Sequence, residues 1–378
     1  MPEVLVRGII TETNQQKEHG MPTYPDYFDI LLSNIQPDPQ RLATAQTILP
    51  DVRDYLKKHE ALKTVNPHTR LAGSYPRDTA IDALKDVDTL AIIHKDYLDE
   101  KPSAVITVLY RMLEKLPESI GGSVTVDLRK QRRSIHVCFA NLDFHLDVVP
   151  VVMPTTIDEV LRVPDRGWEE WVETHPLGYQ QWLSELNKKH GGKVVPLIKL
   201  TKHWRDCHFV YKRPKSYWLE CMVVRHIDRG WVTTDSLSYA EMFTALLKSI
   251  YDRYAGQLKD PKAKPPHIPD PMLSNNVAWN WERSHFEAFM ARVEESSKWA
   301  QRALEKDVEH EAEGVELWQQ VFDGTFPTMA EVQARKAAEA ARLGILSVAS
   351  TGRVITTPSS TVKSVLSPQH RFFGDENE

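Results

Sequence analysis

The sequence predicts an α+β protein in two parts, a first part of strands and helices and a second part of helices alone. Short apolar runs with strand character, such as Asp86–Ile93 and Asp143–Val152, lie in the first half of the chain. After about residue 165, tryptophans and apolar residues at helical spacing dominate. At ~100–200 residues per domain, the 378 residues suffice for two domains or three.

In the first part, the helical spacing of Leu42, Ile48 and Val52 predicts a helix over residues 39–60. A strand ends at Leu71–Ala72 in this prediction, before Gly73-Ser74. The other predicted elements are the strand Asp86–Ile93, the helix Val105–Leu116, the hairpin strands Val124–Leu128 and Ser134–Ala140, and the strand Asp143–Val152, which prolines stop.

The second part is predicted to be helical, with breaks at Pro214, at the proline-rich residues 260–271 and at Gly324–Pro327. The predicted helices are 167–189, 193–208, 215–229, 236–257, 280–310, 312–322 and 329–343. Residues 347–369, rich in Ser, Thr, Val and Pro, predict a flexible tail. These elements divide the chain into an N-terminal segment (1–38), an α+β core (39–165), a helical domain (166–327) and a C-terminal helix with its tail (328–378).

Composition and charge exclude several classes of protein. With 41% hydrophobic and 26% charged residues, the chain is neither collagen-like, coiled-coil nor wholly disordered. Its net charge of −5 argues against a generic nucleic-acid coat, and weakly against a long nucleic acid as substrate. Three scattered cysteines fit the reducing cytoplasm better than a disulfide framework. The longest apolar run, Val148–Pro154, is far shorter than the ~20 residues of a membrane span, so no membrane partner is expected.

One combination of residues indicates chemistry. Asp86 and Asp88 alternate along a strand, so both carboxylates project from the same face. Such close like charges favour a divalent cation, and Mg²⁺ prefers carboxylates together with phosphate oxygens. Gly73-Ser74, twelve residues before Asp86, offers a backbone that a phosphate can approach closely. Asp147, on a later apolar strand, would complete three carboxylates able to hold two metal ions.

Each of these patterns is ordinary when it stands alone. Asp-x-Asp is common outside metal sites, and Gly-Ser is more often a turn than a phosphate cradle. Their order and spacing together predict nucleotidyl transfer, in which a hydroxyl attacks the α-phosphorus of a nucleoside triphosphate and pyrophosphate leaves.

The segment GSYPRDTAIDALKDVDTLAII resembles the G-S…[DE]-h-[DE]-h signature of the polymerase-β-like nucleotidyltransferases, and in more detail the bacterial cGAS/DncV-like nucleotidyltransferases (CD-NTases). LDVVPVV, VVPLIKLTKHWRD and KSYWLE resemble later segments of that family, and the likeness covers about residues 40–327. The family has glycine where this chain has Asp78. The resemblance implies a polymerase-β-like core with a mixed sheet, a C-terminal helical domain like that of oligoadenylate synthases, and a bilobal shape with the active site in the cleft.

The same resemblance assigns roles to three later residues. Lys202 matches a lysine that binds the triphosphate, although a solvated face of an amphipathic helix is the plainer interpretation. Ser216 would bind a phosphate oxygen, or cap the helix that starts near Tyr217, or do both. Tyr217 would stack on a nucleobase, with an ordinary core aromatic as the alternative.

The family implies a product and partners. The product would be a cyclic di- or trinucleotide second messenger in bacterial antiphage (CBASS) defence, made from nucleoside triphosphates with ATP among them. Two Mg²⁺ ions would be required, with Mn²⁺ able to substitute. The alternatives are a linear oligonucleotide synthase, a template-independent RNA or tRNA nucleotidyltransferase, and a catalytically silent nucleotide-binding protein. The C-terminal tail would dock a CBASS accessory protein, or is an unimportant frayed terminus.

Two further features stay open at this point. The basic run Arg129–Arg133 is predicted to be a solvated hairpin tip, with a nucleotide or nucleic-acid contact as the alternative. His145 shares a strand face with Asp147 and is interpreted as a structural residue that could also line the site. Cys207 lies close to two histidines, but the spacing fits no zinc site.

Overall fold

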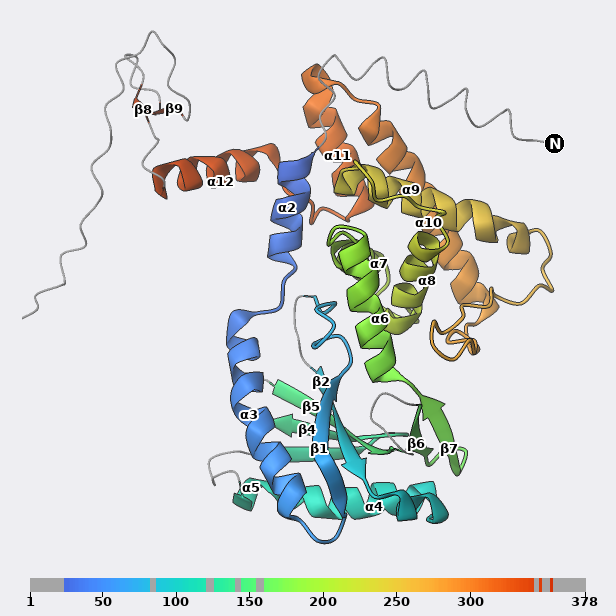
Figure 1. Ribbon diagram of the computed structural model, residues 1–378. Coiled ribbons are helices and arrows are strands. Elements are labelled where there is room, and N and C mark those ends of the chain that lie inside the picture. Colours follow the sequence, from blue (N-terminus) through green and yellow to red (C-terminus); the bar gives the residue numbers. More distant parts are fainter. Residues whose placement is uncertain are drawn as a thin grey trace, which may run out of the picture.

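The computed structural model describes residues 24–81, 86–119, 126–139, 144–153 and 160–342, with the pairs 347–348 and 354–355. These residues form two lobes, a sheet lobe in the lower half of Figure 1 and a helical lobe above it. The predicted tail lies almost wholly outside the described residues, as does most of the predicted N-terminal segment. In the described part of the chain, no helix is long and apolar enough to cross a membrane.

Among the residues that the structure describes, seven strands form one mixed sheet in the order β1-β2-β5-β4-β3, with β6 pairing on β5 and β7 on β6. β2 and β5 run parallel, and every other pair is antiparallel. The strands are β1 (Thr64–Ala72), β2 (Asp86–Ile93), β3 (Val126–Lys130), β4 (Ile135–Phe139), β5 (Phe144–Val152), β6 (Leu161–Asp165) and β7 (Glu170–Thr174).

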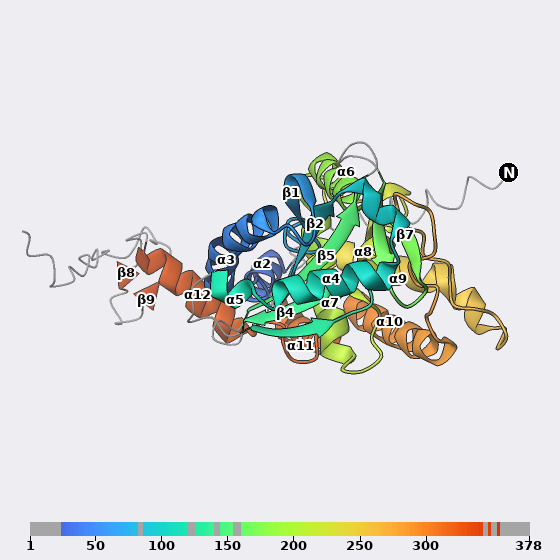
Figure 2. The ribbon, with the colours of Figure 1, turned by 90° about the horizontal axis from the view of Figure 1, so that it is seen from below.

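The two faces of the sheet have different neighbours. On β2, Val87, Ala91 and Ile93 pack against α3 (Pro39–Lys58) and α4 (Pro102–Leu113). Figure 2 shows α4 lying across the underside of the sheet, away from the helical lobe. Alternation along the strand turns Asp88, Leu90 and Ile92 to the other face. The short helices η2 (Lys95–Asp99) and α5 (Leu116–Ser119) flank α4 in the chain.

The helical lobe is held by one large aromatic and aliphatic core. Its α9 begins with a capping box, in which Ser238 and Glu241 satisfy each other's backbone N–H groups. The helices of this lobe are α6 (Pro176–Lys189), α7 (Val194–His208), α8 (Ser216–Asp228), α9 (Tyr239–Tyr254), η4 (Ala255–Leu258), α10 (Arg283–Leu304), η5 (Val308–His310) and α11 (Glu311–Val321).

The described end of the N-terminal segment belongs to the helical lobe. Helix α2 (Pro25–Asn34) inserts Phe28 edge-on against Trp318 of α11, with ring centroids 4.9 Å apart. The Tyr24 hydroxyl donates to the Ala303 carbonyl at 3.1 Å. Residues from both ends of the chain therefore share one core. Helix α12 (Met329–Arg342) follows this lobe, and β8 (Ser347–Val348) pairs with β9 (Val354–Ile355) in the tail.

The structure differs from the sequence prediction around residue 165. Strand β6 was not predicted, and residues 170–174, predicted as the start of a helix, form β7. The segment pairs with β6 over its whole length, and α6 begins only where Pro176 supplies a first-turn residue with fixed φ. The sheet therefore continues to Thr174, past the predicted domain boundary at 165.

Candidate active site

The loop after β1 is pressed against a carboxylate of the next strand. Gly73 has φ +76°, and a Cβ on it would stand 1.9 Å from Asp88 Oδ2. Only glycine allows both this backbone and this approach. The Thr79 N–H donates to the Ser74 carbonyl at 3.0 Å and closes the loop on itself.

Two of the three predicted carboxylates lie side by side on one face of the sheet. Asp88 of β2 stands directly opposite Asp147 of the parallel strand β5. Leu90 lies two residues after Asp88 and Val151 four residues after Asp147, and both apolar residues belong to one cluster. The two carboxylates therefore share the face that looks toward the helical lobe. The backbone of Asp86 is paired with His145, while its side chain lies outside the described residues.

Asp147 is held by two neighbours. Its Oδ1 lies 2.8 Å from Nδ1 of His136 and accepts from Nε2 of Gln131 at 3.2 Å. His136 stands opposite Asp147 in the β4–β5 pair, and the ring of His145 packs edge-on against it at 4.9 Å. The sequence interpretation considered His145 but missed His136, because the pairing of β4 with β5 could not be seen in a local pattern.

The residues present fit a divalent metal. Paired carboxylates are the hard oxygen donors that Mg²⁺ prefers together with phosphate oxygens, and the backbone at Gly73 lies close against Asp88. Among the described side chains, no three His, Cys, Asp or Glu come together as a metal group. Asp86, the expected third carboxylate, is not among those side chains.

A cavity of about 350 Å³ opens between the lobes beside Asp88. This is the size of a small-molecule site. The residues that line it include Gly73, Ser74 and Asp88 from the sheet lobe, and Tyr179, Ser216 and Tyr217 from the helical lobe. Five of these six were predicted site residues, and the structure brings them together from segments more than 100 residues apart.

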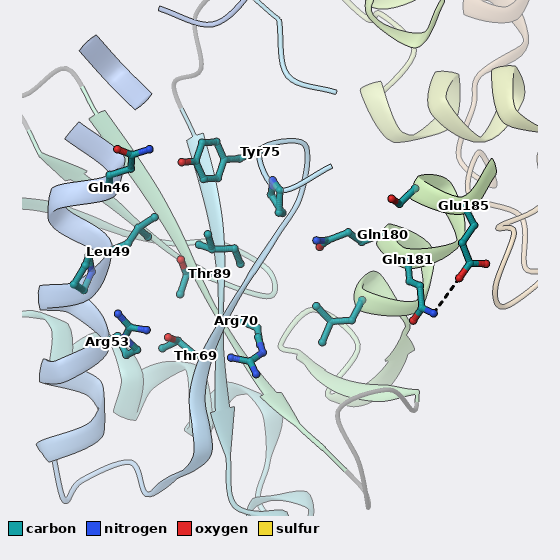
Figure 3. A pocket seen from close by; sticks show the side chains of 15 residues that line it. Gln46, Leu49, Arg53, Thr69, Arg70, Tyr75, Thr89, Gln180, Gln181 and Glu185 are labelled. Carbon is teal, nitrogen blue, oxygen red and sulfur yellow. Dashed lines mark hydrogen bonds between the residues drawn. The ribbon is translucent and has the colours of Figure 1, made fainter. Parts of the chain in front are cut away.

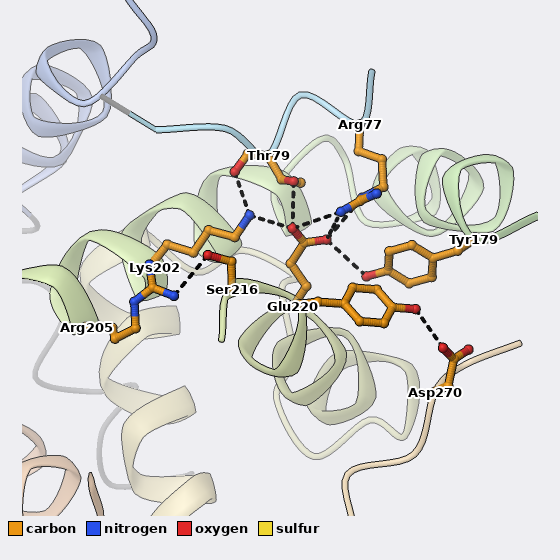
Figure 4. Close-up of polar contacts among 9 residues, drawn as sticks. Arg77, Thr79, Tyr179, Lys202, Arg205, Ser216, Glu220 and Asp270 are labelled. Carbon is orange, nitrogen blue, oxygen red and sulfur yellow. Dashed lines mark hydrogen bonds and ion pairs between the residues drawn. The ribbon is translucent and has the colours of Figure 1, made fainter. Parts of the chain in front are cut away.

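Lys202 does not line this cavity. Its side chain is buried, and Nζ donates to the Thr79 carbonyl at 2.8 Å and to Glu220 Oε1 at 2.5 Å (Figure 4). The interpretation of Lys202 as part of a solvated helix face is therefore wrong, because the lysine joins α7 and α8 to the loop that carries Gly73. Its predicted contact with a triphosphate stays a prediction.

Glu220 is the centre of this buried network. It accepts from Arg77 Nε at 3.1 Å and from the Thr79 hydroxyl at 2.8 Å, besides Lys202. Burial alone would raise the pKa of Glu220, but the charges of Lys202 and Arg77 outweigh it and hold that pKa below its usual value. Burial lowers the pKa of Lys202, and Glu220 opposes that shift. The sequence analysis missed Arg77 and Glu220; an acid in the middle of the apolar helix SYWLECMVV was the signal for the latter.

Ser216 and Tyr217 lie at the N-terminal end of α8, and each has a hydrogen-bond partner. The helix begins at Ser216 with Lys215 as its N-cap, so the prediction that Ser216 caps the helix is wrong. Instead, Ser216 Oγ accepts from Arg205 at 3.0 Å. The Tyr217 hydroxyl donates to Asp270 at 2.9 Å. Its ring meets that of Tyr179 edge-on at 5.3 Å, and both rings line the cavity.

The departure from the family pattern at Asp78 has a visible consequence. Asp78 has φ 53°, in the left-handed region where glycine is favoured and aspartate is tolerated. Its Oδ1 accepts from Nζ of the buried Lys199 at 2.7 Å. The aspartate therefore adopts a glycine conformation and adds an ion pair that a glycine could not make.

A larger cavity, of about 970 Å³, lies beside β1, between α3 and α6 (Figure 3). Thr89 lines it, and since Thr89 alternates with Asp88, it faces away from the carboxylates. The candidate site is therefore the smaller cavity, where Asp88 and the Gly73 loop meet.

Comparison with known proteins agrees with this geometry. Residues 21–187 match the family model of the Second Messenger Oligonucleotide or Dinucleotide Synthetase domain. The chain is 32% identical over 355 residues to a cyclic AMP-AMP-AMP synthase of an Acinetobacter species, covering 91% of this chain and 96% of the relative. It is 24% identical to a cyclic AMP-AMP-GMP synthase of Enterobacter hormaechei, covering 79% of this chain and 91% of the relative.

Solved structures show the same fold. E. coli CdnC with ATP matches with a TM-score of 0.63 at 16% identity, over 81% of this chain and 99% of that one. Vibrio cholerae DncV cyclic AMP-GMP synthase with nonhydrolyzable GTP matches with a TM-score of 0.61 at 14% identity, over 82% and 98%. The fold and the paired carboxylates define a nucleotidyltransferase of the polymerase-β-like class. Within that class the chain belongs to the cGAS/DncV-like family, and it is a cyclic oligonucleotide synthase.

Proposed function

We propose that this synthase joins ATP into a cyclic trinucleotide second messenger that acts in antiphage (CBASS) defence. The observation that carries the proposal is the cavity in which the Gly73 loop, Asp88 and Tyr217 meet. The relative that matches 91% of this chain is named a cyclic AMP-AMP-AMP synthase, which supports adenosine as the base. Two adenylate transfers would extend the chain, and a third would close the ring.

In this proposal the donor nucleotide lies in the cavity between the lobes. Backbone amides of Gly73 and Ser74 bind its phosphates, and the Tyr217 ring faces its base. We assign the main cationic contact to Arg77, which lines the cavity: Glu220 engages its Nε and Nη2, and Nη1 would bind a phosphate. Lys202 supports this contact from behind, through Glu220. Ser216, which lines the cavity and accepts from Arg205, would bind a phosphate oxygen.

Asp86, Asp88 and Asp147 would hold two Mg²⁺ ions, or Mn²⁺ in their place. Bound there, the ions would supply positive charge to balance the leaving pyrophosphate and would lower the pKa of the attacking hydroxyl. His136 and Gln131 orient the carboxylate of Asp147 through its Oδ1, which fixes the direction from which an acceptor hydroxyl meets the donor.

We also propose a protein partner and a location. A solved relative, E. coli CdnC, is described in complex with a HORMA protein, which supports an accessory protein for this chain at its C-terminal tail. The cysteines, three in number and far apart in the sequence, support a reducing, cytoplasmic environment.

A product assay tests the function. The purified protein is incubated with all four nucleoside triphosphates, labelled one at a time at the α-phosphate, with Mg²⁺ and separately with Mn²⁺. Products are treated with phosphatase and resolved by mass. A phosphatase-resistant cyclic triadenylate is expected. A cyclic product with another base overturns the choice of ATP alone, and phosphatase-sensitive linear products favour a linear synthase.

A further inference from the structure

The turn between β3 and β4 carries two arginines fixed to one buried acid. Arg132 Nε donates to Asp165 Oδ1 at 2.5 Å, and Arg133 Nε donates to Asp165 Oδ2 at 2.8 Å. The Asp165 side chain is fully buried, while each arginine is about two-fifths exposed. This is the basic run that the sequence analysis left open between a solvated tip and a nucleotide contact.

Asp165 is built to hold this pair. Besides the arginines it accepts the backbone N–H groups of Gly167 at 3.0 Å and Trp168 at 3.2 Å. Burial would raise the pKa of Asp165, but the hydrogen bonds from Arg132 and Arg133 lower it, so the acid stays charged. Each arginine donates to Asp165 through Nε, and within the described part of the chain its two Nη groups have no hydrogen-bond partner. Two oriented guanidinium forks therefore remain to bind an anion.

Exposed indoles from both lobes adjoin the arginines. The Arg132 guanidinium lies 3.8 Å from the ring centroid of Trp168, which is 47% exposed. Trp279, in the segment of the helical lobe before α10, is 61% exposed and lies 5.7 Å from Trp168 between ring centroids. Gly167 makes room for this arrangement, since a Cβ there would stand 2.9 Å from Arg132 Nε. Trp279 is the more open of the two rings and suits stacking on a planar group, while the Arg132 guanidinium already lies over Trp168.

The cluster lies beside the carboxylates, on the side away from the Gly73 loop. Leu161 and Val163 of β6 pack with Val151 on the carboxylate face of the sheet, and Asp165 continues their alternation. Gln131, next to Arg132 in the chain, donates to Asp147. In the strand order β1-β2-β5, the Gly73 loop follows β1, so it flanks Asp88, whereas the arginine turn flanks Asp147.

We propose that Arg132, Arg133, Trp168 and Trp279 bind the acceptor through its 5′-triphosphate and its base, and so select acceptors that carry a 5′-triphosphate. This inference rests on the proposed function. In the reaction, the acceptor ribose oxygen forms a bond to the donor α-phosphorus and the α–β phosphoanhydride bond breaks. Pyrophosphate leaves, and the hydroxyl proton passes to solvent. The arginines fit phosphates bidentately, and the indoles hold the base while the ribose reaches Asp147.

The test offers two acceptors to one enzyme. Labelled ATP is supplied with an equal concentration of adenosine, and products that begin with a 5′-hydroxyl are separated by mass from those that begin with a triphosphate. The wild type is expected to initiate almost entirely from ATP. In the Arg132→Gln/Arg133→Gln variant, the share of adenosine-initiated product is expected to rise at least about tenfold, since a hydrogen bond to a charged group contributes that much or more. Arg129→Gln, in the same run but paired only with the exposed Asp127, should behave as the wild type.

If the double variant folds poorly, a Trp279 variant and binding calorimetry still test the acceptor site. Trp279→Ala removes an exposed ring, and should raise the acceptor KM about fivefold or more while kcat is kept. Linear pppApA replaces ATP in a parallel assay to separate the first acceptor from the intermediate. Calorimetry with a nonhydrolyzable ATP analogue should find two sites in the wild type and one in the double variant.

The outcomes separate the two claims. A wild type that makes cyclic product while the variants keep its acceptor preference overturns the acceptor site and leaves the function standing. A wild type that binds a single analogue also overturns the site. A wild type that binds two analogues, loses one in the double variant and makes no nucleotide product supports the site and overturns the function.

Discussion

Two acidic side chains of this molecule, Asp147 and Glu220, differ in how exposed they are and in the charge of their neighbours. Asp147, in the cleft, is 18% exposed and contacts the histidine ring of His136 and the amide of Gln131. Glu220, at the junction of the lobes, is 1% exposed and meets the full charges of Lys202 and Arg77. The charge of Glu220 is neutralised within the fold. Asp147 is more accessible and stands opposite Asp88, so this pair of carboxylates suits a cation supplied from outside.

The largest expected effect is on activity, in the cleft. Asp86→Asn together with Asp88→Asn should lower product formation at least about 10³-fold, because metal-held charge stabilisation contributes several kcal/mol to such a transfer. The thermal midpoint should stay within about 2 °C of the wild type, since no packed apolar group is removed. The assay is the rate of labelled product, with circular dichroism for the fold.

Asp127→Asn is the matched control for that pair. It removes one carboxylate of the same sheet, on the exposed strand β3, and should leave the rate unchanged. Product formation that survives in the double variant would remove these carboxylates from the mechanism.

At the lobe junction the expected effect is on stability. Glu220→Ala should lower the free energy of unfolding by about 3–5 kcal/mol, because it leaves the buried ammonium of Lys202 without its carboxylate. Denaturant unfolding measures the loss. Glu294→Ala breaks the exposed pair with Lys298 and serves as the control, with no measurable change expected. Equal results for the two variants would mean that burial does not distinguish the pairs.

The same carboxylate gives a pH dependence whose sign follows from its surroundings. Burial opposes the charge of Glu220, but Lys202 and Arg77 prevail and hold its pKa below the usual value of about 4.3. A depressed folded pKa stabilises the protein above that usual value, and the contribution disappears as pH falls through the folded pKa. Glutamine resembles protonated glutamate. The stability gap between wild type and Glu220→Gln should therefore be constant from about pH 8 to pH 5 and shrink below about pH 4.

Gly73 links the two regions, because its loop touches Asp88 at one end and Glu220 at the other. Gly73→Ala should lower kcat about 100-fold, since a Cβ 1.9 Å from Asp88 Oδ2 forces the carboxylate or the loop to move. Gly191→Ala provides the control: Gly191 has φ +62° and open space around it. The Gly191→Ala variant has a similar backbone strain of about 1–3 kcal/mol, but its Cβ clashes with nothing. Equal activities in the two variants would contradict a role for the close approach.

The contrast between the regions also shows what the sequence could predict. Strand alternation predicted that Asp86 and Asp88 share one face, and Gly73-Ser74 was predicted to follow a strand, because these relations depend on local spacing. That Asp147 stands opposite Asp88 depends on the pairing of β2 with β5. The contacts of Lys202 and Glu220 with Thr79 depend on how the two lobes meet. No local period encodes a contact between residues 123 positions apart in the chain.

The same limit explains β6 and β7. The segment EWVET is short and partly polar, and its neighbour Trp168 lies in a stretch rich in tryptophan that reads as helix. Its strand conformation comes from pairing with Leu161–Asp165, which itself pairs with β5 by a single register position, Val152 with Arg162. Pairing with β6 therefore determines that residues 170–174 form a strand, because their intrinsic strand propensity is weak.

The smallest expected effect is at Asp78, where backbone and charge can be separated. Asp78→Gly and Asp78→Ala both lose the ion pair with Lys199, but only glycine accepts φ 53° without strain. Asp78→Ala should therefore be less stable than Asp78→Gly by about 1 kcal/mol in denaturant unfolding.

Asp78→Asn completes the series. Asparagine tolerates the left-handed backbone and keeps an acceptor for Lys199, so its difference from the wild type measures the charge alone. Because Lys199 is buried and also donates to Gln36, that difference should be smaller than the loss in Asp78→Ala. Asp78→Ala equal in stability to Asp78→Gly would mean that the loop relaxes away from its left-handed turn. The aspartate would then serve this position through its charge rather than through its backbone.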